Sequence, residues 1–198
     1  MHYDEALKRL LAGNSRYAAM RQQYPNQSTT HREQLVESQN PFAAILSCSD
    51  SRVPSELIFD QGLGDLFIVR TAGHVVNDLV IASIEYAVFA LRVPLVMVVG
   101  HRNCGAVTSV VQGQALPGHM AQLAETLWPA LRQVDRKADD AVEVAIRENA
   151  RFTAASLGNS SSVLAEALSN DQIRIVAAYY DLKSGVVSLL ERGGEDKE

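Results

Sequence analysis

Apolar residues fall along this chain in two kinds of run, short unbroken ones and longer ones with helical spacing. The unbroken runs are FAAILSC (42–48), LFIVRTA (66–72), VPLVMVVG (93–100) and IRIVAAYY (173–180). Short runs without polar breaks are typical of strands that are buried on both faces of a parallel sheet. The pattern therefore predicts four such strands.

The segments between these runs repeat apolar residues at the spacing of helices. Asn77 is a good capping residue at the start of one such segment, and Gly105 is expected to begin another. The helix that starts at Asn77 is expected over residues 77–92. Three further helices are expected over 118–135, 138–157 and 159–170. Strands that alternate with helices predict an α/β fold with right-handed crossovers.

The two ends of the chain complete the expected architecture. Residues 3–20 form an amphipathic helix, which either packs on a partner subunit or covers its own core. After a turn at 183–185, a last strand can lie antiparallel at the sheet edge, and a solvated tail follows over 191–198. We expect a central, mostly parallel sheet of four strands plus an antiparallel edge strand, flanked by helices, with an N-terminal helical arm.

Length and composition favour one domain over the whole of 1–198, with the arm in 1–35 and the α/β core in 40–198. A chain of 198 residues that is 47% hydrophobic can bury one good core but hardly two. The net charge of −5 and the scattered 18 Lys and Arg residues argue against nucleic acid or a membrane surface as partner. The start lacks the pattern of a secretory signal, and the apolar runs are too short to span a bilayer.

Only two cysteines occur, Cys48 and Cys104, which favours a reducing compartment and a cytoplasmic location over a disulfide-stapled secreted protein. Cys48 ends the first apolar run, and Asp50 follows it two residues on. His101 and Cys104 follow the end of the third run. In open α/β sheets functional groups gather at the carboxyl ends of strands, so these side chains are expected to meet there.

Two thiolates and an imidazole are the ligand set that zinc prefers, and Asp50 offers a possible fourth ligand. The alternatives are that both cysteines are inert core residues beside a hydrogen-bonded His101, or that they form a disulfide or redox pair. Both cysteines lie at strand ends and one has a histidine on the same turn, so we favour a Zn²⁺ site.

Three segments of the sequence together resemble a known protein family. CSDSRVPSELIFDQGLGDLFIVRTAG, SIEYAV and GHRNCGAV, within residues 39–111, resemble the β-class carbonic anhydrases. The resemblance implies that Cys48, His101 and Cys104 bind zinc and that Asp50 pairs with Arg52 beside the metal. It implies the reversible hydration of CO2 to bicarbonate and a proton through attack by zinc-bound hydroxide.

Elementary electrostatics explains why the Asp50–Arg52 pair matters. Two thiolates neutralise the dication, and an ionised Asp50 as fourth ligand would leave the site anionic and closed. A bidentate salt bridge with Arg52 can draw the carboxylate off the metal and free a position for water.

The resemblance also implies a small substrate pocket that is shared between subunits. The residues assigned to bind CO2 or bicarbonate are Gln39, Phe67, Ala72, Tyr86 and Gly105. Such sharing implies a homodimer or a larger homo-oligomer. His74 lies near this site in sequence and could relay protons, although a hydrogen-bonded structural role is the better interpretation.

Two other functions fit the same residues. Hydrolases of carbonyl sulfide or carbon disulfide resemble the same scaffold. A non-catalytic protein in which Asp50 stays locked on the zinc is the third hypothesis, and activity that rises with pH at constant zinc content would separate it from the enzyme.

Overall fold

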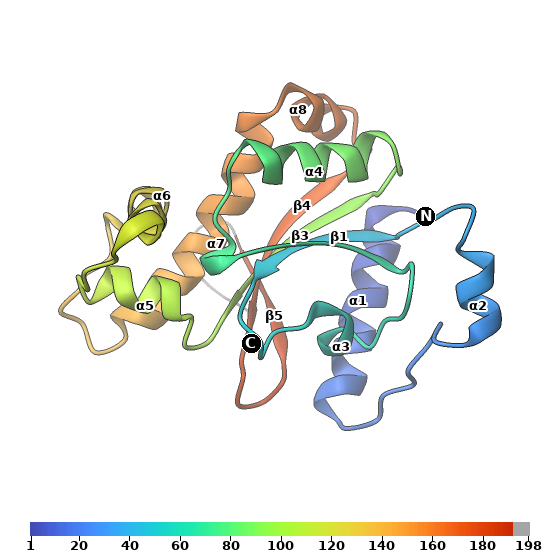
Figure 1. Cartoon of the computed structure of the whole chain (residues 1–198), viewed down its shortest axis with the longest axis horizontal. Coiled ribbons are helices and arrows are strands. Elements are labelled where there is room, and N and C mark those ends of the chain that lie inside the picture. The colour runs from blue at the N-terminus through green and yellow to red at the C-terminus, as the bar shows by residue number, and fades with distance from the viewer. Residues whose placement is uncertain (192–198) are drawn as a thin grey trace.

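Within residues 1–191, five strands form one sheet in the order β2-β1-β3-β4-β5 (Figure 1). The computed structural model describes residues 1–191, so the tail expected at the C-terminus lies almost wholly outside the described part. The first four strands are parallel, and β5 pairs antiparallel with β4. The predicted fold class is confirmed. The strands are β1 (Ala43–Cys48), β2 (Leu66–Thr71), β3 (Leu95–His101), β4 (Arg174–Tyr180) and β5 (Val187–Leu190).

Every helix that the sequence predicts is present with bounds close to the expected ones, and α2 and α3 are additional. Asn77 caps α4 as predicted, because its side chain accepts a hydrogen bond from the Val80 backbone N–H. The helices are α1 (Tyr3–Ala18), α2 (Thr29–Gln34), α3 (Ser55–Ile58), α4 (Asp78–Phe89), α5 (Gly105–Val111), α6 (Ala121–Leu131), α7 (Ala141–Ser160) and α8 (Ser162–Ser169), with short 3₁₀ turns η1 (Ala72–His74) and η2 (Gly118–Met120).

Helices cover both faces of the sheet. In Figure 1, α4, α7 and α8 lie on one side of it and α1 and α3 on the other. The six residues of β1 and the seven of β3 are all buried, as expected for central strands. Among the described residues, no helix is long and apolar enough to cross a membrane.

The expectation of burial on both faces is wrong for β2. All six of its residues are only half-buried, although its sequence is as apolar as that of β1. The reason is its place at the edge of the described sheet, where its neighbour is β1. Periodicity predicts that such a run is a strand but does not give its position in the sheet.

The N-terminal helix packs on its own chain. Ala6 and Leu10 of α1 are fully buried in the hydrophobic core, so this face of the helix covers the protomer itself. The buried carboxylate of Asp60 holds the segment that follows: it accepts hydrogen bonds from the Arg16 side chain, at 2.6 Å, and from the Tyr24 backbone N–H. The helix and the loop after it are therefore anchored to the turn before β2.

Candidate metal centre

The cluster forms where two central parallel strands end side by side. Ser47 of β1 is level with Val99 of β3, so the ends of these strands, at Cys48 and His101, are neighbours. Cys104 stands directly before α5 as its N-terminal flanking residue. The sheet thus brings Cys48 beside His101 and Cys104, which lie more than fifty residues further along the sequence.

Cys48, His101 and Cys104 are all buried, and their ligand atoms lie within 4.8 Å of one another. The two Sγ atoms are 3.9 Å apart, too far for the ~2.05 Å bond of a disulfide, and both cysteines are free. Tetrahedral zinc with Zn–S bonds of about 2.3 Å separates two sulfur ligands by roughly 3.8 Å. The spacing of the thiols fits a zinc ion.

The imidazole of His101 is fixed by a hydrogen bond at one ring nitrogen. Its Nδ1 lies 3.0 Å from the backbone carbonyl of Arg102, to which it donates, so Nε2 is left as the acceptor. That Nε2 is buried and has no hydrogen-bond partner among the described residues. A buried acceptor without a partner is costly, and a metal ion would satisfy it.

The two neighbouring thiols shift each other's pKa in opposite directions. A hydrogen bond from Cys104 lowers the pKa of Cys48 to about 3, although burial opposes the shift. The hydrogen bond to Cys48, together with burial, raises the pKa of Cys104. A divalent cation supplies the charge that ionises the second thiol, so the donor set matches a metal that binds thiolates.

Asp50 and Arg52 form a bidentate ion pair close in sequence to Cys48. Arg52 donates from Nε to Asp50 Oδ1 at 2.9 Å and from Nη2 to Oδ2 at 2.7 Å, and its backbone N–H also reaches Oδ1 at 2.9 Å. These side-chain hydrogen bonds lower the pKa of Asp50 to about 2. The carboxylate is therefore ionised and faces the guanidinium, outside the group formed by Cys48, His101 and Cys104.

Arg70 is a supporting residue that the sequence analysis missed. From β2 its guanidinium donates to the backbone carbonyls of Cys48, at 2.9 Å, and of Asp50, at 2.6 Å. These bonds fix the backbone on which both side chains stand. The signal in the sequence was a single cation at the end of an otherwise apolar strand.

Of the five residues predicted to bind the substrate, the structure of one chain brings Phe67 and Tyr86 into contact. The rings of Phe67 and Tyr86 face each other with centroids 6.3 Å apart. Ala72 and Gly105 are exposed, and a Cβ added to Gly105 would meet open space. Gln39 is exposed in the segment before β1.

His74 has the environment of a structural residue. It is fully buried, and its Nε2 accepts a hydrogen bond of 2.8 Å from the Asn149 amide. Burial lowers the pKa of His74 to about 4, so the ring is neutral at neutral pH. A neutral, buried imidazole is poorly placed to exchange protons with solvent.

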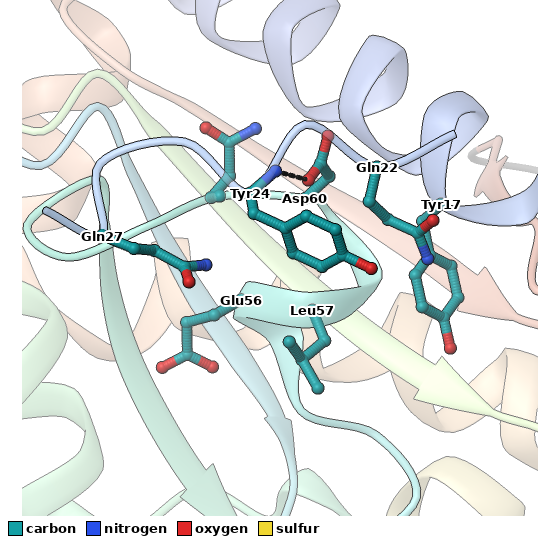
Figure 2. Close-up of a pocket in the computed structure, with 8 residues that line it drawn as sticks. Tyr17, Gln22, Tyr24, Gln27, Glu56, Leu57 and Asp60 are labelled. Atoms are coloured by element: carbon teal, nitrogen blue, oxygen red, sulfur yellow. Dashed lines mark hydrogen bonds between the residues drawn. The ribbon is translucent and has the colours of Figure 1, made fainter. Parts of the chain in front are cut away.

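A separate hollow of about 170 Å³ lies between the segment after α1 and helix α3. Figure 2 shows the ring of Tyr24 between Gln27 and Glu56 on one side and Gln22 and Tyr17 on the other. No thiol or imidazole lines it. We therefore assign the chemistry to the buried cluster and not to this hollow.

Comparison with known proteins gives consistent results. The family model described as carbonic anhydrase matches residues 43–187. Carbonic anhydrase 2 of Mycobacterium tuberculosis is 41% identical over 193 residues, which cover 96% of this chain and 93% of that protein. The carbonic anhydrase of Mycolicibacterium smegmatis is 37% identical over 194 residues, covering 96% and 94%.

Solved structures agree with the sequence relatives. The β-carbonic anhydrase CafA of Aspergillus fumigatus superposes with a TM-score of 0.75 at 29% identity, covering 96% of this chain and 92% of that one. The β-carbonic anhydrase CcaA superposes with a TM-score of 0.76 at 26% identity, covering 93% and 87%.

Proposed function

The chain belongs to the β-carbonic anhydrase family, whose reaction is the reversible hydration of CO2, and from this premise we propose that it performs that reaction with Zn²⁺. Cys48, His101 and Cys104 would hold the ion. The observation that carries the proposal is the 3.9 Å spacing of two buried thiols beside an imidazole Nε2 that has no partner within residues 1–191. When bound, zinc supplies a Lewis acid that lowers the pKa of a water molecule.

The protein's own residues keep the site open and orient the reactants. Arg52 holds the carboxylate of Asp50 by two side-chain hydrogen bonds and so keeps it from closing the site. Asp50 accepts a hydrogen bond from the attacking water and directs its lone pair to the carbon of CO2. This pairing supports an enzyme over a scaffold with Asp50 locked on the metal.

The residues around the cluster would form the substrate site. Phe67 and Tyr86 supply an apolar wall of the kind that an uncharged, linear gas molecule needs. Gln39, Ala72 and Gly105 complete the set, with Gln39 and Tyr86 contributed by different subunits. The absence of a side chain at Gly105 keeps the start of α5 accessible.

The hydration rate is expected to rise with pH at constant metal content. The pKa of Asp50 is lowered to about 2, chiefly by the hydrogen bonds from Arg52, so this carboxylate does not titrate near neutrality. Its pairing contributes to folding stability above the ordinary value of 3.8, and that contribution is lost only as the pH falls through about 2. The rise between about pH 6 and about pH 9 therefore reports deprotonation of the attacking water.

Stopped-flow CO2 hydration across this range, with metal content measured on each sample, checks the expectation. Inactivity at every alkaline pH would favour the scaffold. The same assay with carbonyl sulfide or carbon disulfide tests the hydrolase hypothesis, and turnover of either faster than that of CO2 would contradict our proposal.

A second copy of the chain is expected to cover the face formed by β2 and α4. Leu79, Tyr86 and Phe89 line one side of α4 and are 78%, 53% and 67% exposed, beside the half-buried edge strand. A row of exposed large apolar side chains next to an unpaired strand edge marks an interface. The arrangement would also place Tyr86 beside the partner's site.

Phe89→Arg is expected to convert the oligomer to a monomer and to lower the hydration rate. Light scattering after size-exclusion chromatography measures the mass. Trp128→Arg, at an apolar residue that is 48% exposed on α6, serves as the control and should leave the mass unchanged. A wild-type protein that is monomeric at assay concentration would contradict the shared site.

A cytoplasmic location is part of the proposal. Cys48 and Cys104 are free thiols, and zinc binding requires both in the reduced state. A reducing compartment meets that requirement.

A further inference from the structure

The turn after β2 has an unusual backbone. Gly73 (φ 64°) and His74 (φ 46°) are consecutive left-handed residues, and both are buried. Glycine adopts this conformation freely, but it is uncommon for a residue with a side chain. The surrounding structure must therefore hold this turn in place.

The turn is aimed at one of the metal-binding thiols. The backbone N–H of Gly73 donates a hydrogen bond of 3.3 Å to Cys48 Sγ. A Cβ added at Gly73 would lie 3.1 Å from the Cβ of Ala106 in α5, so the turn fits closely against the helix that follows Cys104. An N–H···S hydrogen bond withdraws charge from a thiolate and fixes the direction of its lone pairs.

A buried amide on α7 binds this turn, which the Thr71 hydroxyl also spans by donating to the Val75 carbonyl at 2.8 Å. Asn149 is only 3% exposed. Its side-chain Nδ2 donates to the Gly73 carbonyl at 3.0 Å and to His74 Nε2 at 2.8 Å. Both N–H groups of the amide thus bind consecutive residues of the turn, which are more than seventy positions away in sequence. A buried amide whose two donors are both used fixes the geometry of its partners.

We propose that Asn149 is a positioning residue for the metal centre, which holds the Gly73 N–H on the Cys48 thiolate and so tunes the strength of that ligand. The inference rests on the proposed metal site but is independent of the substrate. Partners of this second layer typically change metal affinity by about 10–100-fold when they are removed.

Asn149→Ala tests the proposal, with Thr153→Ala as the matched control. Thr153 lies one turn further along α7 and is 5% exposed, so both substitutions leave a similar small cavity in the same helix. We expect Asn149→Ala to release zinc to a competing chelator at about 10–100-fold lower chelator concentration than wild type. In cobalt-substituted protein, the thiolate-to-cobalt absorption band should shift in the same variant alone.

A folded Asn149→Ala protein with wild-type affinity and an unshifted cobalt band would overturn the proposal. Should the variant not fold, NMR-active cadmium in the wild type provides a second test. The Gly73 amide proton should show a scalar coupling to the metal through Cys48 Sγ, and its absence would overturn the proposal. A wild-type protein that binds none of these metals would overturn the metal site itself, which separates the two failures.

Discussion

Replacing Cys48 by Ser is expected to remove the metal and to reduce CO2 hydration to the uncatalysed rate. Serine is close to cysteine in size, but its hydroxyl is a hard, neutral donor, whereas zinc is bound by the soft, anionic sulfur of a thiolate. The hydration rate should fall by more than about 100-fold, which exceeds the effect of removing a residue that only hydrogen-bonds to a metal ligand. Stopped-flow hydration and metal analysis on the same sample measure it.

Ser49→Ala is the control for this substitution. Ser49 is the next residue along the chain and is exposed, whereas Cys48 is 5% exposed and faces Cys104. The control should retain both metal and activity. Equal hydration rates in the Cys48→Ser and wild-type proteins would remove the cluster from the chemistry.

Arg52→Ala is expected to keep the metal and lose most of the activity. The substitution removes both side-chain hydrogen bonds to Asp50 and leaves that carboxylate, in the part of the chain that the structure describes, only the backbone N–H of residue 52. The freed anion should turn to the metal ion and exclude water. We expect hydration at neutral pH to fall by about 10–100-fold while metal content stays at the wild-type level.

An exposed ion pair elsewhere on the protein separates this effect from a general loss of charge. Arg174 pairs with Asp4 at 3.1 Å, and both side chains are about half exposed. Arg174→Ala should leave the hydration rate unchanged, because exposed pairs contribute little to stability. If Arg52→Ala lost its metal along with its activity, Arg52 would be maintaining the site and not keeping it open.

The fold could be predicted because its strands are read directly from unbroken apolar runs. Four parallel strands and an antiparallel fifth follow from run lengths, turn residues and the helices between them. The exposure of β2 could not be predicted in the same way, because an edge strand and a central strand can have the same composition. Strand order depends on tertiary packing, which no single run encodes.

The metal cluster was accessible to sequence reasoning for a topological reason. Cys48 and His101 end strands that a parallel sheet places side by side, and Cys104 follows on the next turn. Their burial and the 3.9 Å separation of the sulfur atoms required the structure.

The supporting residues were not accessible, because their bonds join distant segments. Arg70 stood out as a cation in an apolar strand, but its partners are backbone carbonyls, which leave no pattern of residue types in the sequence. Asn149 did leave a weak signal, since it falls among the buried positions of α7 beside Ala145, Ile146 and Ala150. A polar residue on the apolar face of a helix indicates a buried partner, but it does not identify which one.

The metal content of freshly purified wild-type protein, prepared without chelators, tests the central claim most directly. Elemental analysis should find one zinc ion per chain, and the Cys48→Ser protein prepared in parallel should have lost it. A wild-type protein that hydrates CO2 without a stoichiometric metal ion, or that binds no metal at all, would contradict the account.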